Sequence, residues 1–267
     1  MDSKLNLKNK TIVLTGSAGR VGSRFSEVLS KAGANLILID KNDTENEKIF
    51  KKIKSKFKTN CYFSNIDITN PKEIDDLIKD LLKKYSTIDV LINNAHFVPR
   101  EHPSRDTPFE NYPYDLWKET ISENLNSVFL CCQKFGKIMA KQRKGTIINI
   151  SSIYGITGPD QRIYGKSRLN SPPFYSATKG AMVNLTKYLA SYWGPKNIRV
   201  NTLTLGGVYD KKLHTNKEFV KKYSEKTMLG RMSTVKDYDG AILFLASDLS
   251  SYMTGANMII DGGWTAW

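Results

Sequence analysis

The sequence alternates short β-branched runs with longer amphipathic stretches along its whole length. Runs such as TIVLT from Thr11 and NLILI from Asn35 have the length and residue types of buried strands. Alternation of this kind is typical of repeated strand–helix–strand units, which build a parallel sheet with helices on both faces. Candidate strands begin at Thr11, Asn35, Cys61, Val90, Gly145, Ile198 and Asn257. We therefore predict an α/β fold with a doubly wound parallel sheet of about seven strands.

The stretches between these runs are the predicted helices. At 267 residues the chain has a length that α/β folds commonly use for one unit, so we expect a single domain over residues 1–267. The helices are expected to begin near Val21, Glu45, Pro71, Tyr114, Tyr175 and Val235. Long loops in a compact domain are usually binding loops, and we expect the substrate loops at 95–113, 154–174 and 208–226.

Composition and charge argue against several other classes of protein. No apolar stretch approaches the roughly 20 residues that cross a bilayer, and the N-terminal segment has no apolar signal core, so we expect a cytoplasmic protein without a membrane partner. The net charge is +14, but the lysines are spread along the chain, so we expect no nucleic-acid partner. The cysteines lack metal-ligand spacing, and no metal is expected.

The segment TIVLTGSAGRVG leads from the first predicted strand into the first predicted helix. Glycine permits the tight turn and lets backbone N–H groups at the start of the helix approach an anionic pyrophosphate. The pattern is typical of a Rossmann-type dinucleotide site, although a structural turn in an unrelated α/β protein also produces it. The candidate cofactor residues on this turn are Gly16, Ala18, Gly19, Arg20, Val21 and Gly22.

A second cofactor signal is Asp40, which ends the second predicted strand about 20 residues beyond the glycines. A carboxylate in this place accepts hydrogen bonds from the ribose 2′-hydroxyl of NAD and repels the 2′-phosphate of NADP. NAD is therefore favoured. Lys41 and Arg20 nevertheless offer two cations to such a phosphate, which leaves NADP open. An ordinary turn residue at a strand end is the alternative reading of Asp40.

Further motifs follow in a fixed order. They are NNA ending at Ala95, ENLNSVF around Asn124, INISS ending at Ser152, and YSATK from Tyr175 to Lys179. Together they closely resemble the short-chain dehydrogenase/reductase family, and the resemblance extends from the first strand to the closing DGG at 261–263. It implies an NAD(P)-dependent oxidoreductase. The chain is also similar to oxidoreductases associated with bacterial surface-glycan and flagellin modification.

The spacing of Tyr175 and Lys179 has a chemical reason. Residues i and i+4 share one face of a helix, so the ammonium of Lys179 lies beside the phenol. A nearby cation favours a phenolate that otherwise forms only near pH 10. Tyr175 then becomes usable as a general acid or base. Alternatively, Tyr175 and Lys179 simply lie on the same face of an ordinary amphipathic helix.

The resemblance also implies the roles of individual residues. Ser152 would hydrogen-bond the substrate oxygen, Tyr175 would exchange the proton, Lys179 would also hold the nicotinamide ribose, and Asn124 would anchor a water relay. Alternatively, Ser152 is a strand-end turn residue and Asn124 a polar residue inside a helix. Ser151 is the neighbouring candidate, but the family usually uses the second serine of the pair. Further cofactor contacts are implied for Asp67, Ile68, Asn94, Ala95 and Val208.

Three features depart from the usual pattern of the family's single-domain members. Arg20 stands where a glycine is usual, the interval from Ser152 to Tyr175 is longer than is common, and His96 replaces a glycine. The first two resemble the sugar-nucleotide-modifying branch. We therefore expect a hydroxyl-rich substrate such as a sugar, sugar phosphate or nucleotide sugar. Basic residues in the two long loops suit an anionic substrate, because guanidinium groups pair with phosphate or carboxylate, but ordinary surface charge explains them at least as well. Those residues are Arg100, Arg105, Arg162, Lys166 and Arg168.

Two other functions remain open at this point. One is an epimerase or dehydratase that retains its NAD, which the glycine spacing favours but the length of the chain does not. The other is a non-catalytic dinucleotide-binding protein, which would not require Ser152, Tyr175 and Lys179 in register. Because family members are commonly tetramers, we also expect a homo-oligomer, a dimer or a tetramer, with the helix from Tyr175 to Trp193 as a candidate interface.

Overall fold

The computed structural model describes residues 5–99, 107–167 and 170–267. Its strands form one parallel sheet in the order β3-β2-β1-β4-β5-β6-β7. Each strand begins at the residue predicted from the sequence, because β-branched runs bounded by polar residues define these strands locally. The strands are β1 Thr11–Thr15, β2 Asn35–Ile39, β3 Cys61–Ser64, β4 Val90–Asn93, β5 Gly145–Ser152, β6 Ile198–Leu205 and β7 Asn257–Ile260.

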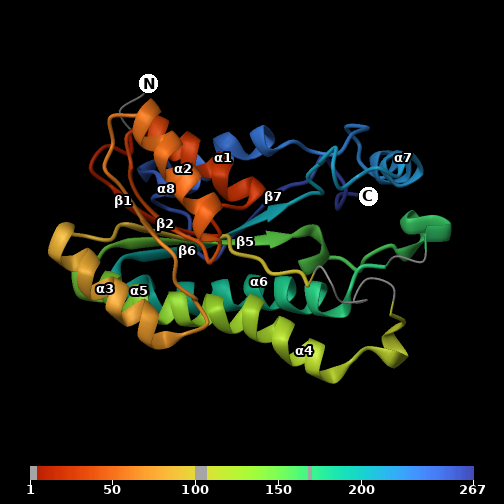
Figure 1. Cartoon of the computed structure of the whole chain (residues 1–267), viewed down its shortest axis with the longest axis horizontal. Coiled ribbons are helices and arrows are strands. Elements are labelled where there is room, and N and C mark those ends of the chain that lie inside the picture. The colour runs from red at the N-terminus through yellow and green to blue at the C-terminus, as the bar shows by residue number, and fades with distance from the viewer. Residues whose placement is uncertain (1–4, 100–106, 168–169) are drawn as a thin grey trace.

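Helices cover both faces of the sheet (Figure 1). Phe25 and Ile242 belong to the buried apolar cluster of one face, and Phe135 and Met182 to that of the other. None of the helices among the described residues has the combination of length and apolarity that spanning a membrane requires. On the first face lie α1 Arg20–Lys31, α2 Asp43–Lys56 and α8 Asp239–Ala246; on the second lie α3 Pro71–Lys84, α4 Tyr114–Ile121, α5 Ser127–Gln142 and α6 Pro173–Trp193.

The order of the strands places the ligand crevice. The chain runs from β1 outward to β3 on one side and then crosses to β4 on the other, so the loops that follow β1 and β4 diverge from adjacent strands. Open parallel sheets bind ligands at this point, beyond the carboxyl ends of the strands. Nearly all the residues singled out in the sequence lie there.

Two helices have no predicted start: α5, which continues from α4 through a short π-helical turn, and α7. α7, Lys217–Glu225, lies inside the segment that was expected only as the loop 208–226, and Figure 1 places it beyond the ends of the strands. The side chain of Asn216 caps it by accepting hydrogen bonds from the backbone N–H groups of Glu218 and Phe219. This Asn followed by Glu two residues later was the signal in the sequence, but the helix is too short for its apolar period to stand out.

Candidate active site

The glycine turn after β1 is packed too tightly for side chains. Gly16 has φ of +66°, and a Cβ atom there would lie 2.6 Å from the Cα atom of Ala95. A Cβ on Gly22 would overlap the carbonyl oxygen of Gly16. Helix α1 begins at Arg20 after Gly19, which has no side chain to cap it, so the first turn presents its backbone N–H groups without a side-chain partner at this cap. Such a helix start fits a pyrophosphate.

Asn94 joins this turn to the loop after β4. Its amide nitrogen donates to the carbonyl oxygens of Thr15 and Gly16 at 3.1 and 3.0 Å. The Thr15 hydroxyl in turn accepts from the backbone N–H groups of Asn94 and Ala95, both at 3.1 Å. The structure therefore brings Asn94 and Ala95 directly against the predicted glycine turn.

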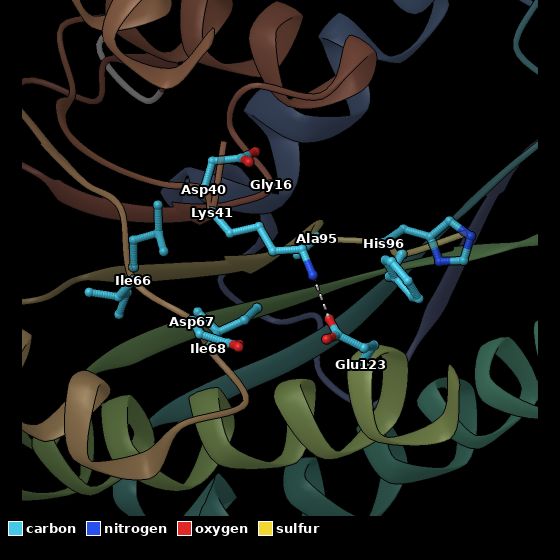
Figure 2. A pocket seen from close by; sticks show the side chains of 11 residues that line it. Gly16, Asp40, Lys41, Ile66, Asp67, Ile68, Ala95, His96 and Glu123 are labelled. Carbon is cyan, nitrogen blue, oxygen red and sulfur yellow. Dashed lines mark hydrogen bonds and ion pairs between the residues drawn. The ribbon is translucent and has the colours of Figure 1, made fainter. Parts of the chain in front are cut away.

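A cavity opens between the ends of β2, β3 and β4, beside the glycine turn (Figure 2). Five residues predicted to contact the cofactor line it, together with six others, of which only Lys41 was considered for the cofactor site. The predicted residues are Gly16, Asp40, Asp67, Ile68 and Ala95; the others are Ile39, Lys41, Ile66, His96, Phe97 and Glu123.

The carboxylate of Asp40 is held at the rim of this cavity. Its Oδ2 accepts from the backbone N–H of Ala18 at 2.9 Å, and its Oδ1 accepts from the N–H of Asn42 at 3.0 Å. These bonds fix the carboxylate between the glycine turn and the start of α2. The position fits the recognition of a ribose diol, because each carboxylate oxygen has a second lone pair for a hydroxyl donor.

The two cations that were considered as partners of a 2′-phosphate are each paired with a carboxylate. Arg20 Nη1 lies 3.1 Å from a carboxylate oxygen of Asp210, on the loop that follows β6. Lys41 Nζ lies 3.1 Å from Glu123 Oε2. Val208 lies on the same loop as Asp210, where it forms a single bridge with Ser233, and it is not among the residues lining the cavity. The sequence could not predict these ion pairs, because their partners are far apart in the chain.

Ser152, Tyr175 and Lys179 come from two neighbouring elements, β5 and α6. Ser152 is the last residue of β5, and its Oγ accepts from the backbone N–H of Tyr154 at 3.3 Å. The ring of Tyr154 lies edge-on to that of Tyr175, 6.3 Å away. Ser151 instead uses its hydroxyl to donate to the carbonyl oxygen of Lys179, which fastens β5 to α6. Of the two serines, Ser152 is therefore the one whose hydroxyl is not committed to the helix.

The ammonium of Lys179 is buried beneath Tyr175. Lys179 is only 4% exposed, and its Nζ atom lies 6.0 Å from the centroid of the Tyr175 ring. Nζ also donates to the carbonyl oxygen of Ile150 at 2.9 Å. Burial lowers the pKa of Lys179 to about 8 from its ordinary 10.5, because a cation loses solvation there. The predicted neighbourhood of the two side chains is thus present in the fold.

Asn124 is fully buried in a π-helical turn, Ser122–Asn126, between α4 and α5. Its Oδ1 accepts from the N–H of Phe97 at 2.9 Å, and its Nδ2 donates to the carbonyl oxygens of Phe97 and Thr120, each at 2.9 Å. The side chain therefore ties the loop after β4 to the helix. Single π-turns are frequent at functional sites, and this one aims Asn124 at the cavity wall.

Replacement of Asn124 by alanine is expected to lower the free energy of unfolding by about 2–4 kcal/mol. The change leaves the half-buried N–H and C=O groups of Phe97 without their side-chain partner and opens a cavity. Urea denaturation followed by circular dichroism measures the effect. Glu119→Ala, on the exposed side of α4, is the control and should shift stability by no more than about 0.5 kcal/mol. An Asn124→Ala protein as stable as the control would contradict this role.

Beyond the strand ends lies an aromatic cluster that the sequence analysis missed. We use this name for Tyr154, Tyr164, Phe219, Tyr223 and Trp264, which pack next to Tyr175. The rings of Tyr223 and Trp264 are 4.3 Å apart. His96 approaches Tyr175 from the side of the cavity, with ring centroids 5.0 Å apart. The cluster joins residues from the segment after β5, from α7 and from the C-terminal segment, which only the folded chain brings together.

The structure describes only two of the five basic residues that were expected to meet the substrate, Arg162 and Lys166. Arg162 forms a two-bonded pair with Asp160, at 2.8 and 2.9 Å, and its side chain is 87% exposed. Its guanidinium is therefore already matched by a carboxylate. Lys166 is exposed. Arg100, Arg105 and Arg168 lie outside the described residues.

The chain resembles known proteins over nearly its whole length. The profile of the enoyl-(acyl carrier protein) reductase family matches residues 16–265. The chain is 30% identical to the post-translational flagellin modification protein A of Campylobacter coli, over 97% of this chain and 99% of that protein. It resembles the crystal structure of a short chain dehydrogenase from Leptospira borgpetersenii with bound NAD+, at 33% identity and a TM-score of 0.83, covering 99% of this chain and 96% of that one. It also resembles a gluconate 5-dehydrogenase from Burkholderia cenocepacia in complex with NADP and tartrate, at 25% identity and a TM-score of 0.87, covering 99% and 98%.

Proposed function

The chain belongs to the short-chain dehydrogenase/reductase family, and from that premise we propose that Ser152, Tyr175 and Lys179 catalyse NAD-dependent oxidation of an alcohol or reduction of the corresponding carbonyl. Members of this family are NAD(P)-dependent oxidoreductases, and this chain is one of them. The observation that carries the assignment of residues is the buried ammonium of Lys179 beneath the Tyr175 ring. A helix face with no chemical role would not need a lysine buried to 4% exposure.

The proposed cofactor site and the proposed catalytic residues are adjacent. His96 lines the cavity beside the glycine turn and also contacts the ring of Tyr175. A dinucleotide that begins at Asp40 and passes the start of α1 would therefore reach the catalytic tyrosine. The tight packing at Gly16 and the uncapped start of α1 both fit a bound pyrophosphate.

The chemistry of the chain's own residues follows from their positions. A bound nicotinamide supplies the acceptor or donor of a hydride. Ser152 donates a hydrogen bond to the substrate oxygen and fixes its orientation. Tyr175 takes the proton from an alcohol during oxidation and returns it to a carbonyl during reduction. The charge of Lys179 favours the phenolate of Tyr175, and its burial keeps that charge unscreened by water.

We further propose a preference for NAD over NADP. The Asp40 carboxylate would stand against a 2′-phosphate, and the two nearby cations, Arg20 and Lys41, are already paired with Asp210 and Glu123. Relatives bind one or the other, as the NAD+ and NADP complexes above illustrate.

The replacement Asp40→Asn is expected to raise the ratio of kcat/KM for NADP+ to that for NAD+ by roughly tenfold to a hundredfold, because it removes a like charge from the 2′-phosphate position. The amide oxygen still accepts from the N–H of Ala18, so the turn itself is preserved. Initial rates with the two cofactors measure the ratio. Asp43→Asn, at the start of α2, is the matched control. An unchanged ratio would remove Asp40 from the selectivity.

For the substrate we propose a polyhydroxylated alcohol or its carbonyl form, of the sugar or sugar-acid class. Tyr154, Tyr223 and Trp264 of the aromatic cluster are at most 9% exposed, but Tyr164 and Phe219 are only partly buried. Aromatic faces with polar edges near Tyr175 suit a ring with one apolar face and several hydroxyl groups. The gluconate 5-dehydrogenase resemblance supports this class. Arg162 gives little support to a phosphorylated substrate, because its guanidinium already donates hydrogen bonds to Asp160.

A screen of polyols, sugar acids, sugar phosphates and nucleotide sugars with NAD+ and NADP+ tests the proposal. The absorbance of the reduced nicotinamide should rise with at least one polyhydroxylated substrate. Net accumulation of reduced cofactor distinguishes this reaction from epimerisation or dehydration with a retained cofactor. Turnover of a substrate without any accumulation, or binding of cofactor without turnover of any alcohol or carbonyl, would contradict the proposal.

A further inference from the structure

An ion pair crosses the cavity beside the glycine turn. Lys41, the residue after Asp40, extends from the end of β2, and Glu123 comes from the π-helical turn on the opposite wall; Figure 2 shows the bond between them. Their side chains are 54% and 23% exposed. The carboxylate of Glu123 is therefore the more buried partner. If the pair were broken, Glu123 would lose more electrostatic stabilisation than Lys41, because less water is available to replace its partner.

Neighbouring groups hold this pair in place. The ammonium of Lys41 lies 4.7 Å from the ring centroid of Phe97, within the range of a cation–π contact. Phe97 is itself fixed by two backbone hydrogen bonds to Asn124, the residue next to Glu123. Asn124 thus fixes the position of the Phe97 ring, and the preceding residue, Glu123, holds the ammonium of Lys41. The lysine is restrained by two interactions rather than by a single surface contact.

We propose that Glu123 is a specificity-determining residue, which withholds Lys41 from a 2′-phosphate and so strengthens the discrimination against NADP. This inference rests on the proposed dinucleotide site. A phosphate beside Asp40 would need a cation to offset the carboxylate, and Lys41 is the adjacent one. To reach the phosphate, its ammonium must leave Glu123 and Phe97, and a half-buried carboxylate is left without its partner. That loss opposes the binding of NADP and leaves the binding of NAD unaffected.

The replacement Glu123→Gln keeps the size of the side chain and removes its charge. The Kd for NADP+ is expected to fall by about threefold to tenfold, as for the loss of one partly exposed ion pair, while the Kd for NAD+ changes less than about twofold. Equilibrium titration of cofactor, followed by calorimetry or protein fluorescence, measures both constants without turnover. Glu119→Gln removes the same charge one helical turn away, outside the residues lining the cavity, and should leave both constants unchanged.

A double replacement shows whether the gain passes through Lys41. In Lys41→Met the affinity for NADP+ should be no better than in the wild type, and in Glu123→Gln/Lys41→Met the gain should disappear. The inference is overturned if Glu123→Gln leaves the ratio of the two Kd values unchanged, if it alters both equally, or if the gain persists without Lys41. A wild-type protein that binds neither cofactor would overturn the proposed function itself, which the NAD+ titration distinguishes from failure at Glu123.

Discussion

Tyr175→Phe is expected to lower kcat by about 10²- to 10⁴-fold while changing the Kd for the nicotinamide cofactor by no more than about threefold. The replacement keeps the ring and its edge contacts with Tyr154 and His96, so the packing persists. It removes only the hydroxyl that exchanges the proton. Steady-state rates with the best substrate of the screen, together with cofactor titration, measure the two effects.

A tyrosine on the same helix provides the control. Tyr188, in α6, is 63% exposed and has no place in the proposed mechanism. Tyr188→Phe should therefore retain the wild-type kcat. Retention of more than about a tenth of the wild-type kcat by Tyr175→Phe would contradict the assignment of the proton exchange to this hydroxyl.

Lys179→Met is expected to lose activity and gain stability. kcat should fall by about 10²- to 10³-fold, because the phenolate of Tyr175 loses its neighbouring charge. At pH 7 the free energy of unfolding should rise by about 1–3 kcal/mol, because the folded protein no longer buries a cation whose pKa has fallen to about 8. Urea denaturation measures the stability. Lys187→Met, an exposed position of α6, should change it by less than about 0.5 kcal/mol.

The pH dependence of this stability difference has a definite sign. The pKa of Lys179 is about 8 in the folded protein and 10.5 when unperturbed, so between these values the unfolded chain binds more protons than the folded chain. The contribution of Lys179 to stability therefore rises with pH across this window, and below pH 8 the penalty of the buried charge is fully present. The advantage of Lys179→Met should accordingly narrow from pH 7 to pH 10. A variant less stable than the wild type at both pH values would contradict this account.

Much of the fold was predictable because its signals are local. Each strand is a short apolar run with polar flanks, and the start of every strand was predicted correctly. Helix starts were less accurate: α2 begins at Asp43 and α6 at Pro173, each two residues before the prediction. In both cases the residue before the first turn, Asn42 or Pro172, sets the boundary, and periodicity alone does not reveal such a cap.

The juxtaposition of the candidate site residues was predictable in part for the same reason. Asn94, Asp40 and the glycines follow particular strands, so the topology of the sheet brings them to one edge, and the structure places them together. The roles of Glu123 and Phe97 were missed, because their significance depends on which side chains face them across the cavity. Tyr223 and Trp264 were missed likewise, since α7 and the C-terminal segment meet only in the folded chain. Contacts between distant elements carry no periodic signal in the sequence.

The most direct test of the central claim is the rate of the chemical step in a double-mutant cycle. Single-turnover experiments, with the enzyme in excess and the reduced nicotinamide followed by absorbance, compare the wild type, Tyr175→Phe, Lys179→Met and the double variant. If Lys179 acts through Tyr175, the double variant is no slower than Tyr175→Phe alone, because the lysine has no hydroxyl left to assist. If the two losses multiply, the residues act independently, and the proposed pairing of phenol and ammonium is wrong.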